Sequence, residues 1–185
     1  GQITISFNGP NSQDVPTNGQ DVAFLDFTVA SANNVEVKNL RFSVTTTGMG
    51  GATNEKLTDL KVVDSATGAV IAGPYGTDIT TTITGIVLGD TWTVGAGQSR
   101  RLLVKMDVGS ASGLNNDTAY VSLVAFTATD IKIIDSNLDI STTDIVPNAL
   151  TGNTMTAKAA SLTISLSGTP STRTLTAGAQ NVDLL

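Results

Sequence analysis

The stretch "QITISFNGPNSQDVPTNGQDVAFLDFTV", Gln2–Val29, contains two runs of alternating apolar and polar residues, separated by an interval rich in turn-forming residues. Every second residue is apolar from Ile3 to Phe7, and again from Ala23 to Val29. Alternation with a period of two predicts β-strands that turn one face toward a core. The intervening "NGPNS" and "TNGQ" contain the glycine, asparagine and proline that turns favour. The stretch therefore predicts two strands connected by turns.

The same alternation recurs along most of the chain. In "RLLVKMDV", Arg101–Val108, the apolar residues share one face and the charged residues lie on the other. Further strands are expected at Val35–Val44, Leu60–Asp64, Ala69–Ala72, Ile79–Leu88, Thr91–Val94, Thr118–Phe126, Ile131–Asp135 and Thr154–Lys158. About ten short strands with turn signals between them predict an all-β sandwich, in which two sheets bury their inner faces against each other.

Two of these stretches depart from simple alternation. Thr118–Phe126 is fairly apolar on both faces, which predicts a central strand covered on both sides. In Val35–Val44 the apolar positions change face near Lys38 and Asn39. A β-bulge or a crossing from one sheet to the other would produce that change.

The end of the chain repeats its beginning. "SLTISLSGTPSTRTLTAGAQNVDLL", Ser161–Leu185, aligns with Gln2–Leu25 with one inserted residue, and reproduces two strands and their connection in order. We therefore expect one β-sandwich domain at residues 1–160. We interpret residues 161–185 either as the start of a next repeat, with a period of about 160 residues, or as a strand-donating tail. A donated strand would enter the equivalent groove of a neighbouring molecule.

Composition excludes several classes of function. Charged residues make up 14% of the 185 residues, and the formal net charge is −6. Nucleic-acid binding needs clustered Lys and Arg, so we expect no nucleic-acid partner. No run approaches the roughly 20 apolar residues of a membrane-spanning helix, so we expect no membrane insertion. Low charge combined with abundant Thr and Ser is typical of extracellular wall, sheath and stalk proteins, and predicts a location at the cell surface.

The chain resembles a family of surface proteins. The stretches that carry the resemblance are "VEVKNLRFSV", "LTDLKVVDSATGAVIAG", "TWTVGAGQSRRLLVKMDV" and "ISLSGTPSTRTLTAGAQNVDLL". They are similar to the tandem Ig-like β-sandwich repeats of large prokaryotic cell-surface proteins of the S-layer, filament and adhesin type. The resemblance implies an Ig-like, Greek-key sandwich with an extracellular structural or adhesive role, and it carries over no catalytic residue.

We expect no enzymatic activity. The chain contains no Cys and no His, which excludes a disulfide framework, a thiol nucleophile and a histidine base. Neither a Gly-x-Ser-x-Gly elbow nor a phosphate-binding loop is present. No cofactor is expected, apart from calcium, which binds hard oxygen ligands in loops. Asp117, Asp130 and Asp135 are the candidate calcium ligands, with solvated turn residues as the alternative interpretation.

Two further surface sites are candidates. Asn116 begins the sequon "NDT", a glycosylation acceptor in exported proteins. Sugar binding favours exposed aromatic rings, and Tyr75 in "GPYG" is the candidate glycan contact. Trp92, the single tryptophan, is expected in the core or at an interface.

The sequence predicts a structural subunit of an extracellular filament, sheath or surface layer. Its partner would be a second copy of itself, joined head to tail through terminal β-strands. The expected assembly residues are Ile3, Ile5 and Phe7 at one end of the chain and Leu162, Ile164 and Leu166 at the other. The alternative function is an adhesive or carbohydrate-binding β-sandwich domain of a repetitive surface protein.

Overall fold

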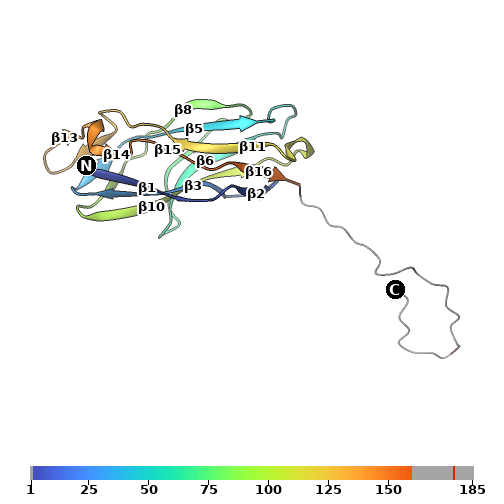
Figure 1. Ribbon diagram of the computed structural model, residues 1–185, viewed down its shortest axis with the longest axis horizontal. Coiled ribbons are helices and arrows are strands. Elements are labelled where there is room, and N and C mark those ends of the chain that lie inside the picture. Colours follow the sequence, from blue (N-terminus) through green and yellow to red (C-terminus); the bar gives the residue numbers. More distant parts are fainter. Residues whose placement is uncertain (1, 160–176, 178–185) are drawn as a thin grey trace.

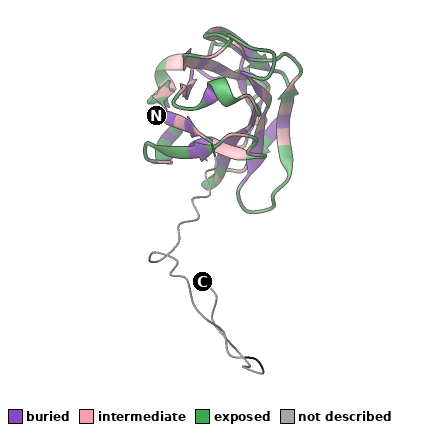
Figure 2. Cartoon of the chain, turned by 90° about the vertical axis from the view of Figure 1, so that its right-hand side faces the viewer, coloured by how far each residue is buried: buried purple, intermediate pink, exposed green. Residues whose placement is uncertain are grey.

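The computed structural model describes residues 2–159 and residue 177, and the regular secondary structure of the described part consists almost entirely of β-strands. The strands form three sheets. Seen along the sandwich, buried segments line the interior and exposed segments form the rim (Figure 2). The prediction of an all-β, sandwich-like fold is confirmed. No helix among the described residues is long and apolar enough to cross a membrane.

The first sheet has six strands in the order β14-β1-β3-β10-β6-β7. These strands are β14 (Ile145–Val146), β1 (Ile3–Gly9), β3 (Val22–Ser31), β10 (Gln98–Val108), β6 (Leu57–Asp64) and β7 (Val70–Tyr75). All neighbours in the sheet are antiparallel except β14 and β1, which run parallel.

The second sheet has the order β2-β16-β11-β5-β8, with β15 also paired to β11. Its strands are β2 (Gln13–Pro16), β16 (Met155–Lys158), β11 (Thr118–Leu123), β5 (Leu40–Thr47), β8 (Ile83–Leu88) and β15 (Leu150–Thr151). The third sheet, β13-β12-β4-β9, consists of β13 (Leu138–Asp139), β12 (Ile131–Ile133), β4 (Val35–Val37) and β9 (Trp92–Val94). Two short 3-10 helices, η1 (Ser112–Leu114) and η2 (Thr142–Asp144), lie in the connections.

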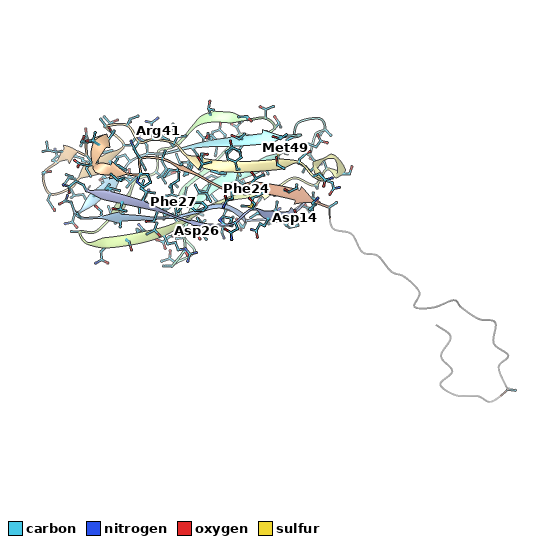
Figure 3. The ribbon with its side chains drawn as sticks, viewed as in Figure 1. Asp14, Phe24, Asp26, Phe27, Arg41 and Met49 are labelled. Carbon is cyan, nitrogen blue, oxygen red and sulfur yellow. The ribbon has the colours of Figure 1, made fainter. Side chains whose placement is uncertain are left out.

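Strand β3 lies at the centre of the first sheet and contributes heavily to the core. It pairs with β1 on one side and with β10 on the other. Leu25 and Phe27 are fully buried, as their alternation predicts. Phe24 is also buried, because the register between β3 and β10 shifts by one residue beside it. This bulge adds a third large side chain to the space between the sheets, where Figure 3 shows Phe24 and Phe27.

The phase change at Lys38 and Asn39 is a crossing between sheets. β4 belongs to the third sheet and β5 to the second, and only two residues separate them. Val35 and Val37 are buried in one sheet, and the inward face then resumes at Leu40 in the other. Of the two predicted explanations, the crossing is therefore the one that the fold adopts.

Asp130 holds this crossing in place. Its backbone carbonyl accepts a 2.7 Å hydrogen bond from the Lys38 N–H, and its fully buried carboxylate accepts one of 2.9 Å from Asn39 Nδ2. Arg41 donates to both carboxylate oxygens, at 2.6 and 2.9 Å, and Thr127 N–H donates at 2.6 Å. Burial alone would raise the pKa of Asp130, but these hydrogen bonds outweigh burial and lower the pKa to about 2.

The outcomes at other predicted strands are mixed. Thr118–Leu123 is central in its sheet as predicted, yet its outer face is only half-buried rather than covered. The predicted strand Ile79–Leu88 is shorter, because Ile79 instead forms an isolated bridge with Leu57 and the regular strand begins at Ile83. Additional short strands bring the described total to sixteen rather than about ten.

We predict that Arg41→Met destabilises the sandwich by about 3 kcal/mol at neutral pH, because it leaves the Asp130 carboxylate buried without its charge partner. Lys56→Met is the matched control. Its ion pair with Asp78 is far more exposed, and its loss should cost less than about 1 kcal/mol. Urea denaturation of both variants measures the difference, and equal losses would contradict the role given to Asp130.

Candidate assembly surfaces at the two ends of the sandwich

The chain enters the sandwich at one end and leaves it at the other. Figure 1 shows the N-terminus beside β14 at the left end, and β16 pointing out of the right end. The pairing explains this arrangement. The first strand, β1, begins beside β14. The chain then crosses to the second sheet as β2, which runs parallel to the last strand, β16. We call these the entry end and the exit end.

At the entry end, the chain is fixed from its first described residue. Gln2 N–H donates to the Asp144 carbonyl at 2.8 Å, and the Gln2 carbonyl accepts from Ala32 N–H at 2.9 Å. The Gln2 side chain also accepts a hydrogen bond from Asn33 Nδ2. Thr4 then pairs with Val146 in the parallel ladder. The backbone is therefore held on both sides before the first turn of the fold.

At the exit end, hydrogen bonds continue to the last residue before the undescribed segment. The carbonyl of Lys158 accepts from Thr17 N–H at 2.9 Å, and its Nζ bonds to the side-chain oxygen of Asn116. Ala159 N–H donates to Asn115 Oδ1 at 3.1 Å. The departing chain is therefore attached to the loop that follows η1.

The predicted assembly residues at the start of the chain do not behave as one group. Ile3 and Ile5 are 0% and 2% exposed, and they belong to the core of their own sandwich. Phe7, expected on the same buried face, is 41% exposed, because it lies next to the irregularity at which β1 leaves its register with β3. The partner residues Leu162, Ile164 and Leu166 lie outside the described residues.

The three candidate calcium ligands have different surroundings. Asp130 is fully engaged by Arg41 and its neighbours, and Asp135 accepts a hydrogen bond of 3.1 Å from Asn34 Nδ2. Asp117 instead lies beside η1, near Glu55. Within the described residues, no group of three or more acidic side chains is placed to hold a metal ion.

Asp117 and Glu55 form an unusual pair of like charges. Oδ2 of Asp117 is buried and has no hydrogen-bond partner among the described residues, whereas Glu55, itself 8% exposed, accepts from Ala52 N–H at 2.9 Å. Burial raises the pKa of Asp117, and the negative charge of Glu55 raises it further. Gly48 and Gly113 lie against the two carboxylates, and a Cβ on either glycine would overlap a carboxylate oxygen.

The remaining candidates are divided between surface and core. Asn116 is exposed with φ 78°, and its side-chain oxygen contacts Lys158. Tyr75 is half-buried against the core, which makes it a poor platform for a sugar ring. Trp92 is 6% exposed and lies under the Arg100 guanidinium at 5.5 Å from the ring centre. Its placement in the core agrees with expectation.

An open hollow at the entry end is lined by small and polar side chains. Its volume is about 350 Å³, and its walls are Gln2, Thr4, Ala30, Ser31, Ala32, Gly97, Gln98 and Ser99. Hydroxyl and amide groups of this kind can hydrogen-bond a polar ligand. None of the lining residues is aromatic, so the hollow lacks the stacking surface typical of sugar sites.

Sequence reasoning missed three buried or nearly buried carboxylates with arginine partners. Asp26, Asp64 and Asp130 are 7%, 5% and 0% exposed, and they pair with Arg101, Arg100 and Arg41 respectively. The partners are 36 to 89 residues apart in the chain. Two adjacent arginines, Arg100 and Arg101, indicate in the sequence that acidic partners could lie nearby. No sequence pattern identifies Asp64 and Asp26 as those partners.

Comparison with known proteins adds no family assignment. No family model matches the chain, and no curated protein matches its sequence.

We predict that Asp117→Asn stabilises the protein at neutral pH. Because the folded-state pKa of Asp117 is raised, ionisation of this carboxyl disfavours folding as pH rises above the unfolded value of 3.8. The amide keeps the shape and removes the charge, so the melting temperature at pH 7 should rise by about 1–4 °C.

The gain from Asp117→Asn should disappear near pH 3, where Asp117 is already protonated in the parent. Asp14→Asn is the control, since Asp14 is exposed toward the same end (Figure 3) and should change little. Thermal melts at the two pH values check both variants. A lower melting temperature for Asp117→Asn at pH 7 would show that its carboxylate is not a repelled charge.

Proposed function

We propose that the chain is a structural repeat unit of an extracellular assembly, in which β-sandwich units follow one another head to tail. The observation that carries this proposal is the placement of the entry and exit ends at opposite ends of the sandwich (Figure 1). Units joined in this way extend in one direction, whereas a domain whose ends lay side by side would fold the chain back on itself.

The repeat in the sequence keeps the residues that the backbone requires. Gly9 has φ 133°, a conformation that favours glycine, and its counterpart is Gly168. At Gly19 a Cβ would lie 2.8 Å from the Pro16 carbonyl oxygen, and the counterpart is Gly178. Both glycines are required by the local backbone geometry, so their recurrence is not explained by an overall abundance of glycine. It supports a second copy of the same fold.

The repeat also keeps most of the core positions of its counterpart. The buried apolar residues of β1 and early β3 align with apolar residues: Ile3 with Leu162, Ile5 with Ile164, Phe24 with Leu184, and Leu25 with Leu185. Val15 is the buried exception, because its gap-free counterpart is Thr174. The agreement at four of five buried positions supports the interpretation of residues 161–185 as the beginning of a further sandwich.

The strand order is consistent with an Ig-like unit, which the resemblance in sequence implies. An Ig constant-type sandwich places strands A, B, E and D in one sheet and C, F and G in the other. Here β1, β3, β10 and β6 are adjacent in one sheet, and β5, β11 and β16 are adjacent in the other. After β1, the chain passes to the other sheet as β2, which pairs there with the last strand, β16.

Covalent continuation is better supported than strand exchange between separate molecules. Residues 2–25 already fill β1, β2 and the start of β3 in their own sandwich. A donated segment would have to expel buried side chains, each worth roughly 1.5–3 kcal/mol. Exchange also requires opening the pairing of β3 with both neighbours. Head-to-tail exchange remains the second route to a polymer, and it gives a different result in the deletion experiment below.

We predict that residues 161–185 can begin a complete unit. In a two-unit chain, Leu185 is followed by a copy of residues 26–159. Its calorimetric unfolding enthalpy should be about twice that of the 185-residue chain. Ile164→Asp, at the counterpart of buried Ile5, should halve that enthalpy by unfolding the second unit. Ser165→Asp, at the counterpart of exposed Ser6, should not. Equal effects of the two substitutions would reject the repeat.

We also predict that deletion of residues 161–185 leaves the first sandwich intact and monomeric. Its melting temperature should stay within about 2 °C of the full chain, because the described hydrogen bonds end at Ala159. Light scattering and thermal melts measure mass and stability. If the full chain forms oligomers that the deletion abolishes, strand exchange is the correct mechanism and covalent continuation is not.

A further inference from the structure

We infer that consecutive units are packed against each other end to end in a stiff junction, with the loop after η1 of one unit facing η2 of the next. The occupant of the entry end is thus the exit end of a preceding copy. This inference rests on the proposed function, since it requires that residues 161–185 begin a second sandwich.

The chain is held by hydrogen bonds close to both ends of the sandwich. Ala159 is bonded to Asn115 at the exit end, and Gln2 is bonded to Asp144 and Ala32 at the entry end. The alignment places Ser161 at the position of Gln2. If the second unit holds Ser161 as the first holds Gln2, a single residue remains between the two fixed points.

That single residue limits the separation of the units. Two peptide steps span at most about 7 Å between the Cα atoms of residues 159 and 161. Because Asn115 and Asn116 are exposed beside the first fixed point, a separation of this size is expected to bring the two ends into contact. Neither glycine nor proline occurs in residues 159–161, so the connection has none of the freedom of a Gly-rich linker.

The contacting surfaces can be named from the hydrogen bonds that anchor the chain. On the exit side they are Asn115 and Asn116, which hold Ala159 and Lys158. On the entry side they are Asn33 and the η2 turn, which hold Gln2. Both surfaces are polar loops, so the predicted junction is a small polar contact made rigid by its short connection.

The experiment measures the spread of distances between two spin labels in the two-unit chain. The protein has no Cys, so Val87→Cys in each unit provides one labelling site per unit. Val87 is 43% exposed on β8. We expect one narrow distance distribution. Insertion of Gly-Ser-Gly-Ser after residue 160 should broaden the distribution at least about twofold.

Asn115→Ala in the first unit should also broaden the distribution, because it releases Ala159. Asn11→Ala is the matched control, since Asn11 is exposed and its side chain makes no hydrogen bond within the described residues. If both units fold but the uninserted chain is as broad as the inserted one, the stiff junction is wrong while the repeat stands. If the second unit fails to fold, as calorimetry reports, the proposed function and the junction both fall.

Discussion

The fold depends on one constraint: the chain must pass between sheets without turning its apolar side chains toward water. Among the places where it does so are the step from β1 to β2, the step from β4 to β5, and the stretch that leads from β14 to β15 and β16. The first and last of these run alongside each other, since β1 is parallel to β14 and β2 is parallel to β16. The separation of the entry and exit ends follows directly from that pairing.

Charged residues are few, and three of the buried carboxylates hold neighbouring segments of the backbone in place. The Asp130 carboxylate fixes the crossing between β4 and β5, and Asp26 and Asp64 tie neighbouring strands of the first sheet to Arg101 and Arg100 on β10. A carboxylate that is buried but well bonded specifies one arrangement, because any other leaves the charge without partners. Asp117 is the opposite case, since its buried oxygen has no partner and Glu55 lies near.

Alternation was sufficient to predict most of the strands that face the core, and the change of phase at Lys38–Asn39 located an irregularity without distinguishing a bulge from a crossing. It could not predict that Phe24 would be buried, because a bulge depends on the register with a distant strand. Three strands of the third sheet lie within predicted strands, but the sequence did not show that they form a sheet of their own, since that depends on pairing between remote segments. At the ends of the sandwich, the sequence indicated the repeat, and alternation predicted the inward face of Ile3 and Ile5, which were expected in an assembly contact but lie in the core of their own sandwich. The hydrogen bonds of Gln2 and Ala159 depend on contacts between remote segments, so no local pattern contains them.

The parallel pairing of β2 with the last strand, β16, has a mechanical consequence. If such a unit is pulled by its two ends, β2 and β16 are drawn past each other along their length. The bonds of the ladder from Met155 to Lys158 then bear the load together rather than opening one after another, as they would in a hairpin pulled apart from its open end. Forced unfolding is governed by the barrier to rupture rather than by equilibrium stability. A sandwich with this pairing is expected to resist tension, which is the load that the proposed string of units would carry.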